Sequence, residues 1–166
     1  MMTNEQLANA VVSRFCEAKL KIATAESCTG GLVAAYLTSI SGSSNVIECG
    51  IIAYANRIKQ SQLNVSVEDL TVHGAVSKQV AIAMADSIRI KSNADFGVST
   101  TGIAGPTGGT DEKPVGTVHI AVSTKKKIYH EKLELLEECG NNRDQIRNTT
   151  VNRVFTLVLL ALEEQF

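Results

Sequence analysis

The stretch TAESCTGG, residues 24–31, places a serine beside a cysteine and follows them at once with a threonine and two glycines. Either Ser27 or Cys28 could attack a carbonyl carbon, provided that a neighbouring base takes up its proton. The two glycines allow the backbone to approach a ligand closely, because they carry no Cβ atom. The simpler interpretation is that Ser27 caps an ordinary helix, since serine strongly favours that position.

A candidate base lies in YANRIK, residues 54–59, which follows the next apolar segment. If a helix begins at Asn56, Lys59 lies one turn into it and could reach back toward Ser27, with Tyr54 between them. A lysine acts as a base only when it is neutral, so burial or positive potential must lower its pKa below about 10.4. The alternative is an ordinary solvated lysine.

Cys28 is the rival nucleophile, because a thiol is intrinsically more reactive than an alcohol. On a helix its side chain would point about 100° away from that of Ser27, so only one of the two can face a cleft. We expect Ser27 to face the cleft and Cys28 to pack against the sheet.

The glycine-rich segment TTGIAGPTGGTDEKP, residues 100–114, could bind an anion, because successive glycine N–H groups can form a concave phosphate site. It matches neither GxxxxGK[ST] nor GxGxxG, which excludes the common triphosphate and dinucleotide motifs. Arg143 could add a two-pronged phosphate contact, or instead pair with Asp144 or Glu138 at the surface. Thr101 could donate to a ligand or merely end a strand.

Apolar spacing and turn residues predict the elements that would position these side chains. The predicted helices cover 5–20, with Asn4 as cap, then 29–40, 56–63, 76–90 and 143–163. The predicted strands cover 22–25, 46–54, 96–101, 115–123 and 128–135. This order favours a single domain over residues 1–166, an α/β fold with a three-layer α/β/α sandwich and a mostly parallel, mixed five-stranded sheet. The strand over 46–54 is apolar on both faces and is expected to be central. The loops after the first three strands should then meet at one edge, where ligands gather in such sheets.

The composition points to a small-molecule partner. A formal net charge of −1 gives no chain-wide basic surface for nucleic acid or an anionic membrane. The N-terminus lacks the features of a signal peptide, and the four cysteines show no metal-ligand spacing, so we expect a reduced cytoplasmic protein without a metal. The apolar residues of the last helix predict a core position with part of the face left for a homodimer; they are Val154, Leu157, Val158 and Leu160.

Four blocks carry a resemblance to a known family: ATAESCTGGLVAAYLTSISGSS, GIIAYANRIKQSQLNV, HGAVS and STTGIAGPTGGTDEKPVGTVHIAV. In this order and spacing they resemble the C-terminal domain of the competence/damage-inducible CinA proteins, from about Glu5 to the last helix. The similarity is to the stand-alone form of the family, without the molybdopterin-binding-like domain that many relatives carry at the N-terminus.

The resemblance implies a nicotinamide-nucleotide amidohydrolase that converts nicotinamide mononucleotide into nicotinic acid mononucleotide and ammonia, without cofactor or metal. It implies Ser27 as nucleophile, with Lys59 and Tyr54 assisting. The family's F-x-G-D-R segment corresponds to residues 137–143, with the aspartate replaced. We expect the substrate to contact Thr29, Gly30, Gly31, Thr101, Gly102, Gly105 and Arg143, with N–H groups around Gly30 and Gly31 holding the oxyanion.

Two other functions stay open at this point. One is a non-catalytic module that binds a pyridine nucleotide or a partner in connection with competence or DNA damage. The other is a hydrolase for a different small amide, which would use the same Ser27 and Lys59 chemistry on another ligand.

Overall fold

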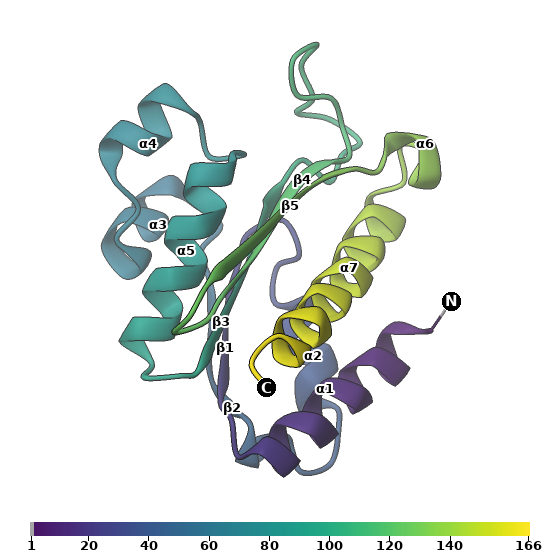
Figure 1. Cartoon of the computed structure of the whole chain (residues 1–166). Helices are drawn as coiled ribbons and strands as arrows, with labels where there is room; N and C mark the ends of the chain where they lie inside the picture. The colour runs from purple at the N-terminus through teal and green to yellow at the C-terminus, as the bar shows by residue number, and fades with distance from the viewer. Residues whose placement is uncertain (1) are drawn as a thin grey trace.

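The computed structural model describes residues 2–166 and consists of one five-stranded sheet between two layers of helices (Figure 1). The strands are β1 (Ile22–Glu26), β2 (Ile47–Ile52), β3 (Phe96–Gly102), β4 (Thr117–Ser123) and β5 (Ile128–Glu134). Their order in the sheet is β2-β1-β3-β4-β5, with β2, β1 and β3 parallel and β4 antiparallel to both of its neighbours. Because only β4 runs against the others, the predicted mostly parallel, mixed sheet is confirmed.

The helices divide between the two faces of the sheet (Figure 1). One face is covered by α1 (Asn4–Ala18), α2 (Leu32–Thr38) and α7 (Arg143–Glu163). On the other face lie α3 (Asn56–Leu63), α4 (Val67–Val72) and α5 (Lys78–Lys91). Two short elements lie in connections, the 3-10 helix η1 (Ser43–Asn45) and α6 (Leu136–Cys139). Within residues 2–166 we find no helix that is both long enough and apolar enough to span a bilayer.

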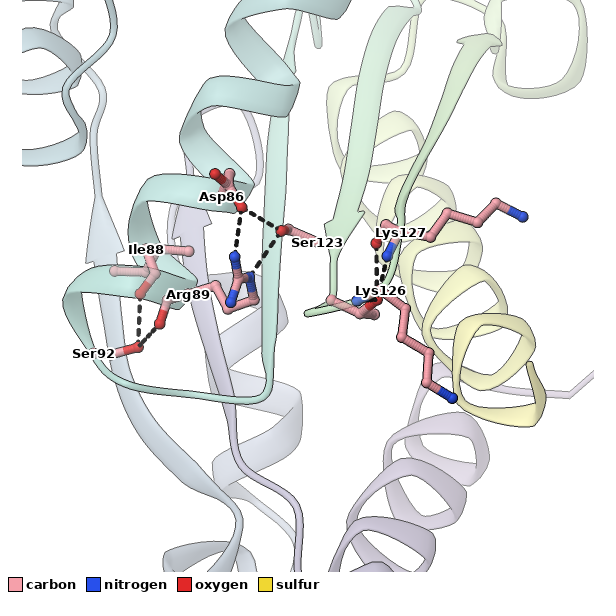
Figure 2. Close-up of polar contacts among 8 residues, drawn as sticks. Asp86, Ile88, Arg89, Ser92, Ser123, Lys126 and Lys127 are labelled. Carbon is pink, nitrogen blue, oxygen red and sulfur yellow. Dashed lines mark hydrogen bonds and ion pairs between the residues drawn. The ribbon is translucent and has the colours of Figure 1, made fainter. Parts of the chain in front are cut away.

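Helix α5 lies unusually close to the sheet. A Cβ atom on Gly97 of β3 would stand 2.1 Å from the carbonyl oxygen of Ala85, so only glycine permits this approach. Arg89 donates to Asp86 and to Ser123 of β4, which ties the C-terminal half of α5 to the sheet (Figure 2). Ser77 caps the N-terminus of α5, because its hydroxyl accepts from the N–H of Val80.

The core under α1 and α7 contains the aromatic contact between Phe15 of α1 and Phe96 of β3, whose ring centroids lie 4.9 Å apart. Three of the four apolar residues expected along the last helix are buried here, whereas Leu160 is 48% exposed. The predicted cap of α1 is wrong by one residue: Thr3 accepts from the N–H of Gln6, and the Gln6 side chain accepts from the N–H of Thr3.

The structure corrects two local predictions and adds two short helices. Strand β2 is an edge strand that pairs only with β1, and exposure alternates along it because the short α2 leaves part of one face open. Helix α2 begins at Leu32 rather than Thr29, since residues 27–31 form a turn that ends at Gly31 with φ 95°. The short helices α4 and α6 were not predicted, because each is too brief to show a periodic apolar pattern.

Candidate functional site

Ser27 lies immediately beyond the carboxyl end of β1 and is held on both sides by the sheet. Its N–H donates to the carbonyl oxygen of Thr100 at 2.9 Å, while the carbonyl of the preceding Glu26 accepts from the N–H of Ala53 at 2.8 Å. The loops after β1, β2 and β3 therefore meet at one edge, as predicted. This fixes the backbone of Ser27 while its side chain, in a residue only 9% exposed, faces a cavity.

Lys59 reaches Ser27 from the first turn of α3. The helix begins at Asn56 as predicted, and the Lys59 Nζ atom lies 3.0 Å from the Ser27 Oγ atom. The same Nζ atom lies 2.8 Å from the carbonyl oxygen of Ala53 and 3.3 Å from that of Tyr54. The alternative of a solvated lysine is wrong, because Lys59 is 2% exposed.

The surroundings of Lys59 favour its neutral form. No carboxylate within residues 2–166 lies at ion-pair distance from its Nζ atom, and all three of its neighbours are neutral oxygens. Burial lowers the pKa of Lys59 below its ordinary 10.5. A neutral amine has two N–H donors and one lone pair. The two carbonyl oxygens of Ala53 and Tyr54 match the two donors, which leaves the lone pair for the hydroxyl proton of Ser27.

Cys28 is unsuited to act as the nucleophile. It belongs to the core cluster that also contains residues of α1, α2 and α7, although it borders the cavity, and burial raises the pKa of its thiol to about 12. The thiol is therefore protonated at neutral pH, whereas thiolate is the reactive form. The expected division of labour between the two neighbours is thus consistent with the packing, with Ser27 beside an amine and Cys28 in the core.

A cavity of about 300 Å³ opens beside this pair, at the low end of the size range of small-ligand sites. It brings together most of the residues singled out from the sequence: Ser27, Tyr54, Lys59, Thr101, Gly102, Gly105 and Arg143. Its wall also includes four apolar residues that the sequence had not singled out, namely Ala75, Val76, Ile103 and Ala104. The mixture of an apolar wall with a nucleophile and a cation suits a small ligand that is part ring and part anion.

Arg143 closes the far side of the cavity. It donates to the carbonyl oxygen of Gly105 at 2.7 Å and to the hydroxyl of Tyr54 at 2.8 Å. The surface pairing considered for it is wrong, because Arg147 lies 3.6 Å from Asp144 and Arg153 pairs with Glu138. Among the described residues Arg143 has no carboxylate partner, so its charge is available to an anionic ligand.

Tyr54 contacts Lys59 through its backbone and not, as expected, through its phenol. Its backbone carbonyl accepts from Lys59, but its hydroxyl points to Arg143 and its side chain belongs to a residue that is 58% exposed. The geometry therefore supports a role of the phenol in contacting a ligand or in controlling access to the cavity, rather than a role in proton transfer at Ser27. Thr101 lines the cavity with its hydroxyl already donated to the carbonyl oxygen of Ala75 at 2.7 Å.

The expected oxyanion donors are wrong. The N–H of Gly31 donates to the carboxylate of Glu26 at 3.0 Å, and that of Gly30 donates to the carbonyl oxygen of Ser27 at 3.0 Å. Thr29 is fully buried and gives its hydroxyl to Glu26 at 2.6 Å. These three residues support the turn rather than line the cavity.

Within residues 2–166 the N–H groups of Cys28 and Thr29 donate to no other residue, but Cys28 alone of the two borders the cavity, because Thr29 is fully buried. The sequence reading missed the buried carboxylate of Glu26. Its signal was a single charged residue closing the otherwise uncharged strand segment IATAE.

A family model for the CinA C-terminal domain matches residues 4–162 of the chain. The chain belongs to this family. A relative in Thermoanaerobacter pseudethanolicus, named for competence-damage induction, is 45% identical over 93% of the chain and 36% of its own length. A CinA-like protein of Anaeromyxobacter dehalogenans is 42% identical over 95% of the chain and 38% of its own length. The chain thus spans little more than a third of these relatives.

Solved structures of CinA proteins share the whole fold. The competence/damage inducible protein CihA of Agrobacterium tumefaciens is 42% identical with a TM-score of 0.91, over 96% of this chain and 95% of that one. A CinA superfamily protein of Enterobacter cloacae is 30% identical with a TM-score of 0.89, over 96% and 92%. The edge of the sheet that carries Ser27 and Lys59 therefore belongs to a fold that these structures share over nearly the whole chain.

A larger hollow of about 810 Å³ lies elsewhere on this CinA domain, along the outer face of α5. Its wall is mainly apolar and includes Ile82, Ile90 and Ile128, and the carboxylate of Asp86 in it is already bound to Arg89 and Ser123. It offers no nucleophile paired with a base, so the smaller cavity at Ser27 is the candidate site.

Proposed function

We propose that this CinA domain hydrolyses the carboxamide of nicotinamide mononucleotide, giving nicotinic acid mononucleotide and ammonia. The observation that carries the proposal is the 3.0 Å contact between the Nζ atom of a buried, carboxylate-free Lys59 and the Oγ atom of Ser27. A serine becomes nucleophilic only with such a base. The resemblance of the four sequence blocks to the amidohydrolase family supplies the substrate class.

In the first half of the reaction, neutral Lys59 takes the hydroxyl proton of Ser27 while Oγ forms a bond to the carboxamide carbon. The carbonyl oxygen becomes an oxyanion, which the N–H of Cys28 at the cavity wall stabilises. The intermediate then collapses: the carbon–nitrogen bond breaks, and the ammonium of Lys59 returns its proton to the departing ammonia. An ester of Ser27 remains.

In the second half, Lys59 takes a proton from a water molecule that attacks this ester. The carbon–Oγ bond breaks, Ser27 regains a proton from Lys59, and the carboxylic acid product gives its remaining proton to solvent and leaves as the carboxylate. No change in the backbone is needed between the two halves, because the same amine faces the same oxygen in each.

The other end of the cavity suits the phosphate of the substrate. Arg143 has no carboxylate partner and lies beside the backbone of Gly105, and the apolar wall from Ala75 to Ala104 suits the pyridine ring. Binding energy at the phosphate would position the distant amide against Ser27. Free nicotinamide, which lacks this anchor, is expected to be a poor substrate.

Ammonia release from a panel of amides tests this function. We expect turnover with nicotinamide mononucleotide and at least a hundredfold lower kcat/KM with nicotinamide riboside and with free nicotinamide. Efficient hydrolysis of free nicotinamide would contradict the phosphate anchor. Binding of the mononucleotide without ammonia release would favour the non-catalytic module, and release from an unrelated amide alone would move the activity to another substrate.

A further inference from the structure

Glu26 is a buried carboxylate directly before the proposed nucleophile. The residue is 1% exposed and, among residues 2–166, its carboxylate has no lysine, arginine or histidine within ion-pair distance. It is instead surrounded by donors from the following turn. They are the Thr29 hydroxyl at 2.6 Å and the N–H groups of Gly31 at 3.0 Å, Val33 at 3.0 Å and Ala34 at 2.9 Å. Both carboxylate oxygens accept hydrogen bonds from these donors.

An isolated buried charge is unfavourable unless donors compensate it closely. Here the compensation comes mainly from the segment that carries Ser27 and the start of α2, with one longer contact of 3.5 Å from the Thr24 hydroxyl of β1. The first turn of a helix leaves N–H groups without partners, and Glu26 binds those of Gly31, Val33 and Ala34. Its carboxylate thereby fixes how α2 meets β1.

A second clamp acts on the same turn from α7. The Arg147 Nη2 atom donates to the carbonyl oxygen of Thr29 at 2.9 Å. The Thr29 hydroxyl in turn lies 2.7 Å from that of Thr100 on β3, the strand that also accepts from the N–H of Ser27. The turn is therefore held by the carboxylate of Glu26, by Arg147 of α7 and by Thr100 of β3.

The result is a sorting of backbone donors around Ser27. Glu26 and the Ser27 carbonyl take the N–H groups of residues 30, 31, 33 and 34, whereas those of Cys28 and Thr29 donate to no other residue between 2 and 166. Cys28 lines the cavity next to the nucleophile. We propose that Glu26 is a positioning residue, which holds the 27–31 turn so that the Ser27 hydroxyl faces Lys59 and the N–H of Cys28 stays available at the cavity. This inference rests on the proposed role of Ser27 as nucleophile.

Glu26→Gln tests the role, because the amide matches the carboxylate in size but places an NH₂ group against N–H donors. We expect kcat for ammonia release to fall at least a hundredfold, with KM changed less than threefold. The rate at which an organophosphorus fluoridate labels Ser27 should fall by a similar factor. A folded Glu26→Gln variant with wild-type kcat and a wild-type labelling rate would overturn the proposal and leave a purely structural carboxylate.

A milder series applies if Glu26→Gln does not fold. Thr29→Val removes one donor to the carboxylate and should slow labelling of Ser27 about tenfold, while Thr29→Ser restores it. The matched control is Thr150→Val, at an equally buried threonine whose hydroxyl donates within α7 to the carbonyl oxygen of Ile146. Equal slowing by Thr29→Val and Thr150→Val, or no rescue by Thr29→Ser, would overturn the proposal.

The labelling arm separates this inference from the proposed function. If the wild type releases no ammonia from nicotinamide mononucleotide but Glu26→Gln slows labelling, the positioning role stands and the substrate assignment fails. If the wild type releases ammonia and Glu26→Gln changes neither readout, the substrate assignment stands and the positioning role fails. A wild-type Ser27 that neither reacts with the reagent nor supports turnover overturns both.

Discussion

Two helices on the same face of the sheet each send a long basic side chain to a strand or strand end, and the two side chains have opposite surroundings. Arg89 of α5 meets a carboxylate, Asp86, and a hydroxyl, Ser123 (Figure 2). Lys59 of α3 meets a hydroxyl, Ser27, and only neutral carbonyl oxygens besides. Arg89 is paired with a carboxylate, whereas Lys59 is not.

The ionisation of the two regions follows from this difference. At Asp86, burial works to raise the pKa, but hydrogen bonds from Ser123 and Arg89 and the charge of Arg89 outweigh it, so the pKa lies below its ordinary value. At Lys59, burial lowers the pKa and no carboxylate opposes it. The Arg89 region thus keeps its charges and ties α5 to the sheet, whereas the Lys59 region favours an uncharged amine that can accept a proton.

The largest expected effect is at the oxygen that this amine faces. Ser27→Ala should lower kcat for ammonia release at least a thousandfold. Within residues 2–166, no other side-chain oxygen at the cavity contacts the Lys59 Nζ atom, so no other hydroxyl can give its proton to this amine. Cys28→Ser should retain most of the activity, since the thiol is protonated and its N–H is unchanged. The measurement is steady-state ammonia release by both variants. If Cys28→Ser released no ammonia while Ser27→Ala remained active, the nucleophile would be Cys28.

Replacing each basic residue by methionine should separate the two regions. Lys59→Met should lower kcat at least a hundredfold, as expected for loss of a general base, while the free energy of unfolding stays equal or rises because a buried amine is removed. Arg89→Met should leave kcat near wild type and lower the free energy of unfolding by about 1 to 2 kcal/mol, since Asp86 is partly exposed and partly screened. Urea unfolding and ammonia release measure both. A large loss of activity in Arg89→Met with none in Lys59→Met would reverse the comparison.

The pH dependence of stability sharpens the same contrast. Since the folded-state pKa of Lys59 lies below 10.5, the unfolded chain binds more protons between the two values. The free energy of unfolding of the wild type should therefore rise with pH across that window relative to Lys59→Met, by about 1.4 kcal/mol per pH unit at most. Urea midpoints at several pH values measure the difference. A difference that falls with pH in this window would mean a raised pKa.

The smallest effect is expected at the phenol of Tyr54. Tyr54→Phe removes the acceptor of Arg143 but keeps the backbone carbonyl that binds Lys59, so kcat should change less than about fivefold while KM rises. Steady-state kinetics with nicotinamide mononucleotide give both constants. A hundredfold loss of kcat would instead place the phenol in proton transfer.

Much of the fold and of the site followed from local sequence patterns. The turn of α3 that brings Lys59 to Ser27 was predictable, because the helix start at Asn56 and the strand order fix that distance. The Arg143 contact to Tyr54 was not, since it joins residues 89 positions apart, one in the loop after β2 and the other at the start of α7. The edge position of β2 was not predicted, because an apolar edge strand beside a short helix has the same sequence pattern as a central strand.

The turn after β1 shows where pattern reasoning stops. Serine followed by two glycines indicated a helix start with free N–H groups, yet Glu26 binds those of Gly31, Val33 and Ala34. A carboxylate that folds back onto the next helix leaves no periodic trace in the sequence. Which donors face the cavity therefore depended on one tertiary contact.

The protonation of Lys59 in the free protein tests the central claim most directly. Carbon-13 NMR of protein labelled at lysine Cε, with Lys59→Met to assign the resonance, follows the amine across pH. We expect Lys59 to titrate below 10.5 and apart from the surface lysines. A Lys59 resonance that titrates with the exposed lysines, or above them, would mean a permanent ammonium beside Ser27 and would contradict the hydrolase mechanism.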